Sequence, residues 1–150
     1  MVKQCMLTSV LLSLVSCVAI NAYSYTEPTK YYASYWGTHT SINLYRCSPS
    51  IMRSQSEIER FIINLFNRLG LVRSGNTQFL YHYAGNGFSS GLSALQQGNG
   101  HTDIAIRMDE LNNDIYIDFF SCLPYNSYEI AHRAQDFFVA FDMTFETVYR

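Results

Sequence analysis

The feature that most constrains the fold is an amphipathic helix that the sequence predicts close to the middle of the chain. Residues 54–57 (Ser-Gln-Ser-Glu) form a capping box, in which the serine and glutamate side chains each satisfy a free backbone N–H group. Gly70 supplies the stop. One helical face is apolar between these signals, and it carries Ile58, Phe61, Ile62, Leu65, Phe66 and Leu69. Because such a face must be buried against another layer, the sequence predicts a layered domain.

Alternating apolar residues predict strands on both sides of this helix. We expect them over residues 38–45, 77–83, 102–108, 115–122 and, as an edge strand, 143–149. Residues 85–91 form a glycine-rich stretch whose glycines indicate a loop with unusual backbone angles. Residues 112–114 form a turn that makes the two flanking strands a hairpin.

A second helix is predicted near the C-terminus. Asn126 and Glu129 cap it, and apolar residues recur at helical spacing at Ile130, Ala134, Phe137, Phe138 and Phe141. The predicted order is β-α-β-β-β-α, followed by the edge strand. We therefore expect an α+β two-layer sandwich: a mostly antiparallel sheet of four to five strands with two helices on one face.

Residues 1–24 have the character of a targeting segment. Lys3 gives a positive start, and the apolar run over residues 6–15 is shorter than the roughly 20 residues of a membrane-spanning helix. Two endings remain open. The four residues that end at Cys17 resemble a lipoprotein box, in which that cysteine is lipidated, whereas Ala22 and Ser24 suit ordinary signal peptidase. We expect an exported protein that is periplasmic, secreted, or an outer-envelope lipoprotein whose lipid is its only membrane contact.

The rest of the chain divides into a tyrosine-rich linker or arm, residues 25–36, and one domain, residues 37–150. The formal net charge of −2, without a basic block, excludes the electrostatic pattern of a nucleic-acid binder. The four histidines are scattered, and neither they nor the cysteines have the spacing of a metal site. Cys47 and Cys122 could pair in an oxidising compartment, but spacing alone leaves their state open.

An ordered set of short motifs resembles the bacterial S-adenosylmethionine decarboxylase family. The set runs from residue 37 to residue 141, and its most specific parts are Gly91-Leu92-Ser93 and the segment over residues 118–122 (Asp-Phe-Phe-Ser-Cys). Such enzymes form a pyruvoyl cofactor from an internal serine, and its ketone accepts electrons during loss of CO₂. The resemblance implies that Ser93 assists self-cleavage, that Cys122 donates a proton, and that His101 follows the serine. It also implies a homodimer formed through the sheet.

The serine that would become the pyruvoyl group is missing. The position before His101 is Gly100, and residues 94–120 contain neither serine nor cysteine. A second histidine of the family pattern falls on Ala105. Our first hypothesis is an exported, catalytically degenerate relative that needs no cofactor and retains a site for a small molecule like S-adenosylmethionine.

Two other functions remain open. One is an active decarboxylase of polyamine (spermidine) biosynthesis, with the pyruvoyl group supplied from another residue. The other is an envelope or secreted protein-interaction module that uses the tyrosine-rich arm.

Overall fold

The computed structural model describes residues 36–83 and 90–150. The predicted leader, Cys17 and all of the arm except Trp36 lie outside these residues, as does most of the glycine-rich stretch. The elements follow one another as β1 (Thr38–Tyr45), α1 (Pro49–Met52), α2 (Gln55–Arg68), β2 (Arg73–His82), β3 (Gly91–Gly98), β4 (Thr102–Asp109), β5 (Asp114–Ser121), α3 (Ser127–Phe138) and β6 (Asp142–Tyr149).

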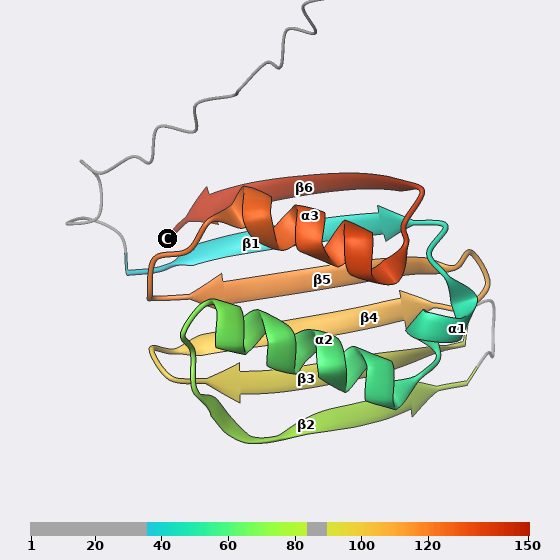
Figure 1. Ribbon diagram of the computed structural model, residues 1–150, viewed down its shortest axis with the longest axis horizontal. Coiled ribbons are helices and arrows are strands. Elements are labelled where there is room, and N and C mark those ends of the chain that lie inside the picture. Colours follow the sequence, from blue (N-terminus) through green and yellow to red (C-terminus); the bar gives the residue numbers. More distant parts are fainter. Residues whose placement is uncertain (1–35, 84–89) are drawn as a thin grey trace, which may run out of the picture.

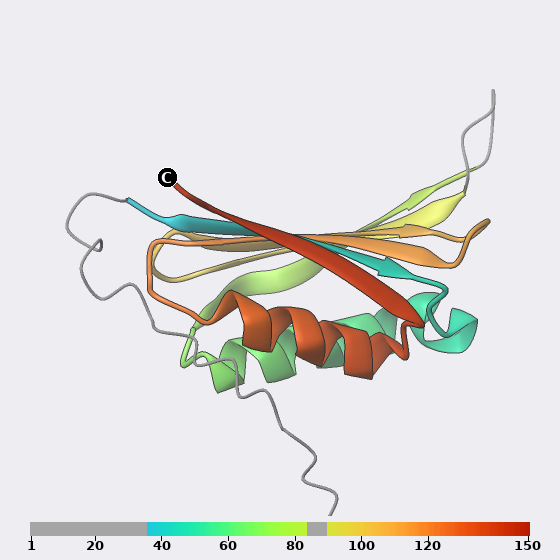
Figure 2. The ribbon, with the colours of Figure 1, turned by 90° about the horizontal axis from the view of Figure 1, so that it is seen from above.

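The strands form one antiparallel sheet, and both long helices lie on one side of it. The strand order is β2-β3-β4-β5-β1-β6, so β1 lies between β5 and β6. In Figure 1, α2 and α3 run side by side in opposite directions across the sheet. The edge-on view in Figure 2 shows both helices beneath the sheet and none above it. The predicted two-layer α+β sandwich is therefore confirmed, with six strands in the described part of the chain against the four to five expected.

Helix α2 has the predicted cap and the predicted buried face. The Ser54 side chain accepts a hydrogen bond from the Glu57 backbone N–H, and Gly70 takes a left-handed φ of +66° just beyond the helix. Five of the six predicted apolar residues are buried, while Leu69 is partly buried against the core. These residues pack on the sheet together with Ile42, Leu44, Ile104, Ile106, Ile115, Ile117, Phe119, Ile130 and Phe138.

Helix α3 ends earlier than the sequence predicts. Asn126 caps its start, but Val139 takes a left-handed conformation with φ +52° and ends the helix after Phe138. Phe141 therefore leaves the apolar stripe and is 71% exposed, with the Arg46 guanidinium 3.5 Å from the centre of its ring. Helical spacing alone placed Phe141 in the core, and a backbone reversal two residues earlier overrides that spacing.

Strand β3 is absent from the predicted order, and β2 begins four residues before its predicted start. Alanine and glutamine are weak strand formers, so the β3 sequence gives little strand signal. Its Gln96 is 1% exposed and accepts hydrogen bonds from Arg73 and Thr77 of β2. The β2–β3 register shifts between Ser74 and Gln78. The buried amide thus satisfies polar groups beside an irregular stretch of β2, an arrangement that binary patterning does not reveal.

Among the described residues, none of the helices has the length and apolar character needed to cross a membrane.

Candidate functional site

The predicted site residues Gly100 and His101 occupy the turn between β3 and β4. The backbone N–H of Thr102 donates to the carbonyl of Asn99, and both central residues have positive φ, +63° for Gly100 and +49° for His101. Two positive φ angles are the requirement of a type I′ hairpin turn, which glycine satisfies without steric cost. The local backbone therefore favours glycine at position 100.

Gly100 lies against the segment that follows β5. Its carbonyl accepts a hydrogen bond from the Cys122 backbone N–H at 3.1 Å. A Cβ atom at position 100 would lie 2.5 Å from Cγ of Leu123. The structure thus brings together the region of the missing serine and the predicted proton donor, while the space that a larger side chain needs at position 100 is filled.

Ser93 lies apart from this turn. It lies near the start of β3, where it pairs with Leu80 on one side and Arg107 on the other. The five residue-to-residue steps from Ser93 to Gly98 span roughly 17 Å of extended chain. Of the residues that the resemblance singles out, Gly100, His101 and Cys122 come together and Ser93 does not.

The two cysteines of the domain are free. Cys47 follows β1 and Cys122 follows β5, and because these strands are antiparallel the cysteines lie at opposite ends of the sheet. An eight-residue strand spans roughly 25 Å, far beyond the reach of a disulfide. Burial, with a smaller contribution from Asp114, raises the pKa of the Cys47 thiol to about 12, so this thiol stays protonated at neutral pH.

A cleft of about 580 Å³ lies beside the β3–β4 turn. Its walls include two aromatic rings, Trp36 and Phe120, whose centroids are 4.9 Å apart. Gln97, His101 and Asp103 contribute polar groups. The cleft therefore combines exposed aromatic surface with hydrogen-bonding side chains and one carboxyl group.

A polar cluster occupies the centre of the sheet face that carries no helix. Asp118 of β5 receives the hydroxyl hydrogen bond of Ser41 at 2.9 Å and lies 3.0 Å from Nη1 of Arg107. Nε2 of His39 is 3.4 Å from the same carboxylate. Ser41 donates to the carboxylate and not to the histidine, so this is not a serine–histidine–aspartate relay.

Asp103 connects the cluster to the cleft. Burial raises the pKa of its carboxyl group, His39 partly offsets this effect, and Asp118 adds to it. The cross-strand partner of Asp103 is Phe120, which lines the same cleft. One continuous surface thus runs from the aromatic wall to the central carboxylates.

In the part of the chain that the structure describes, no group of three or more histidine, cysteine or acidic side chains could hold a metal ion.

Among solved structures, this fold is similar to the crystal structure of the adenosylmethionine decarboxylase from Aquifex aeolicus VF5. The TM-score is 0.64 with 11% sequence identity, and the match covers 77% of this chain and 91% of that chain. The fold is of the adenosylmethionine decarboxylase type. No family model matches the sequence, and no curated protein matches it either.

On this decarboxylase-type fold, the central cluster is not predictable from the sequence patterns alone. Its members come from three strands, and only the register of β1, β5 and β4 places them together: His39, Ser41, Arg107 and Asp118. The one sequence signal for these residues is the period-two alternation of each strand, which places its polar side chains on the face opposite the core. That signal predicts an outward direction but not the neighbours that each residue meets.

Proposed function

We propose that the protein is an exported, decarboxylase-like protein that forms no pyruvoyl group and binds an adenosyl compound in the cleft beside the β3–β4 turn. The observation that carries the first part is Gly100. It stands where the resemblance requires a serine, its φ is +63°, and Leu123 occupies the space that a side chain would need. Export is inferred from the apolar leader, since residues 1–24 combine Lys3 with a short apolar run.

The chemistry of the cleft supports an adenosyl ligand. A purine can stack on the exposed face of Trp36, which is 65% exposed, and the Gln97 amide can hydrogen-bond its edge. Asp103, whose carboxyl group lines the cleft, attracts the positive sulfonium of S-adenosylmethionine. The ligand class is therefore a nucleoside that carries a cationic substituent.

The binding test uses the fluorescence of Trp36, which is the only tryptophan in the chain. We expect S-adenosylmethionine to quench this fluorescence saturably and, at 100 times its dissociation constant, to add about 2.7 kcal/mol to the free energy of unfolding. S-adenosylhomocysteine, which lacks the sulfonium charge, should bind more weakly, and Asp103→Asn should reduce this difference. Absence of both quenching and stabilisation would overturn the proposed ligand and favour the interaction module.

A separate measurement tests the loss of self-processing. The intact mass of the purified mature protein, under denaturing and reducing conditions, should correspond to one uncut chain. Two fragments that meet near residue 100, with a blocked new N-terminus, would restore an active pyruvoyl decarboxylase. This result is independent of the binding test, because ligand binding does not require cleavage.

We further propose that the protein forms a homodimer through the helix-free face of the sheet. This face carries half-buried aromatic and charged side chains, among them Phe120 and Asp118, and no element of the described chain covers it. Light scattering coupled to size-exclusion chromatography should give twice the monomer mass. A monomer at micromolar concentration would contradict this assembly.

A further inference from the structure

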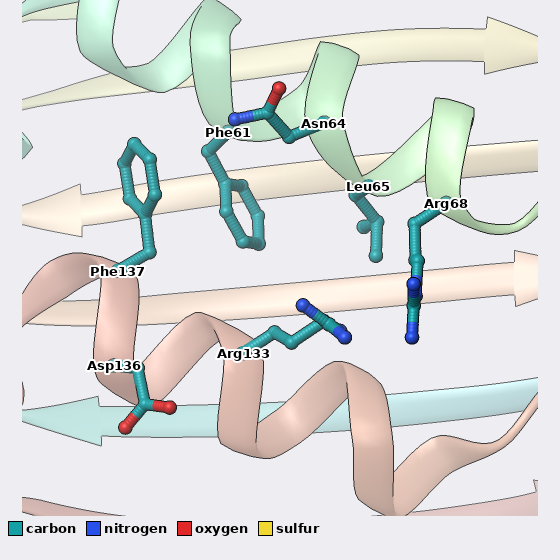
Figure 3. Close-up of a pocket in the computed structure, with 7 residues that line it drawn as sticks. All are labelled: Phe61, Asn64, Leu65, Arg68, Arg133, Asp136 and Phe137. Atoms are coloured by element: carbon teal, nitrogen blue, oxygen red, sulfur yellow. The ribbon is translucent and has the colours of Figure 1, made fainter.

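A second hollow lies on the other side of the molecule, between α2 and α3. Its volume is about 320 Å³. Figure 3 shows Arg68 and Arg133 reaching from the two helices toward each other at one end, with the rings of Phe61 and Phe137 side by side at the other. Leu65 and Phe61 are each 3% exposed and form the floor. The groove therefore has an apolar base and two guanidinium groups at one end.

The two guanidinium groups share a single carboxylate. Nε of Arg68 lies 3.2 Å from Oε1 of Glu129, and Nε of Arg133 lies 2.9 Å from the same oxygen. These hydrogen bonds lower the pKa of the Glu129 carboxyl group. Within the described residues, the terminal nitrogens of both arginines have no hydrogen-bond partner. One negative charge thus faces two positive charges, and donors for a further anion remain free.

The opposite end of the groove sets the length and charge of a ligand. Asp136 lies beside Phe137 on the α3 side of the groove (Figure 3), and its charge would disfavour a second negative group at this end. The partly buried Phe137 ring, whose centroid lies 5.2 Å from that of the nearly buried Phe61 ring, provides aromatic surface at this end. Arg60 stacks on Phe137 from outside, its guanidinium carbon 4.8 Å from the ring centre, and limits the movement of that ring.

We propose that this groove binds a small monocarboxylic acid with an aromatic or aliphatic body. The carboxylate lies between Arg68 and Arg133, and the apolar body covers Phe61, Leu65 and Phe137. The volume suits a ligand of about a dozen heavy atoms. The site shares no residue with the cleft at the β3–β4 turn and lies across the sheet from it, so it does not depend on the proposed adenosyl ligand.

The test compares 4-phenylbutyrate with its uncharged amide, 4-phenylbutyramide, by NMR titration of the full mature protein. The acid should shift the Nε–H signals of Arg68 and Arg133 saturably, and the amide should bind about tenfold more weakly because it lacks the charge-assisted hydrogen bonds. Arg133→Gln should remove this preference. Arg46→Gln, which changes an arginine stacked on Phe141 outside the groove, should leave it unchanged.

The direction in which Glu129→Gln changes the affinity for the acid is the decisive result. Removing this carboxylate frees both arginine Nε groups and raises the positive charge, so the acid should bind several-fold more tightly while the amide is unaffected. If the arginines serve only to hold the two helices together through Glu129, this variant would not strengthen binding. Equal binding of acid and amide, or shifts spread over the whole surface, would overturn the proposal.

Discussion

The two faces of the sheet use the same strands for opposite purposes. Strands β4 and β5 alternate along their whole length, so that Ile106 and Phe119 are buried under the helices while Arg107 and Asp118 point to the other side. The covered face is mostly aliphatic and aromatic, and its few buried polar side chains include Thr40, Gln96 and Thr102. The uncovered face holds a network of charged and hydroxyl side chains at its centre. Consecutive residues of one strand therefore differ in their contribution to folding and to the exposed surface, so a substitution at one is a control for the same substitution at the next.

The comparison teaches where the free energy of folding is concentrated. Burial of apolar area contributes roughly 25 cal/mol per Å², so the helix-covered side holds the fold together. Ion pairs between exposed or half-exposed groups contribute about 0–1 kcal/mol each. Polar groups on the uncovered face are therefore free to serve binding, since changing them leaves the core intact.

The largest expected contrast is between two adjacent phenylalanines of β5. Phe119→Ala removes a fully buried ring and should cost about 3–5 kcal/mol. Phe120→Ala removes a half-buried ring that contacts Trp36 and should cost about 1 kcal/mol. Urea denaturation of both variants measures the difference. Both costs refer to the single protomer, so the measurement is made at protein concentrations that light scattering shows to be monomeric; equal costs there would contradict the one-sided burial of β5.

A second contrast compares two glycines with positive φ. Gly100→Ser should cost about 2–3 kcal/mol, because it adds a contact with Leu123 to the strain of a left-handed backbone. Gly75→Ser has the same strain, with φ +71°, but open space around its Cβ, so about 1 kcal/mol is expected. Denaturant unfolding checks both values. Leu123→Ala in the Gly100→Ser background should recover part of the difference, and no recovery would exclude a clash with Leu123.

Substitutions in the central cluster should change the free energy of unfolding less than the phenylalanine and glycine substitutions above. Asp118→Asn removes the charge that faces Arg107 and His39, and it should lower the free energy of unfolding by about 1 kcal/mol. Because these groups are partly exposed, the loss should shrink at high ionic strength. Thermal unfolding of both proteins at low and high salt measures this effect. A salt-independent loss of several kcal/mol would show that the cluster is sealed from water.

The smallest expected effect is a stabilisation, which Asp103→Asn should produce. Folding raises the pKa of Asp103, chiefly by burial, so ionisation of this group disfavours the folded state as the pH rises through that raised value. Asp103→Asn should therefore stabilise the protein at neutral pH by less than about 1 kcal/mol. The gain should shrink as the pH falls through the unfolded-state pKa of about 4 and vanish about one pH unit lower, where the carboxyl group is protonated in both states. Unfolding curves across this pH range test the sign, and a constant gain would point to a cause other than ionisation.

The sequence predicts the elements whose signals are local. The predicted cap and apolar stripe of α2 are confirmed. Both could be predicted because they depend only on residues within a few turns of each other. Strand β3 was not predicted, since Ala94 and Gln96 carry little strand propensity and the strand is fixed by its pairing with β2 and β4. Phe141 was misplaced because the left-handed Val139 that ends α3 leaves no mark in the apolar spacing.

For the candidate site, the sequence by itself determined which groups are available. The sequence shows that Gly100 stands before His101 where the resemblance expects a serine. Formation of a pyruvoyl group needs the serine hydroxyl, which glycine lacks. Only the tertiary structure decided which groups meet. It placed Gly100 against Cys122, moved Ser93 away from both, and assembled the carboxylates of Asp103 and Asp118 from neighbouring strands. The physical reason is that strand order and register depend on the sum of many distant contacts, whereas caps, turns and reactive groups are properties of a few adjacent residues.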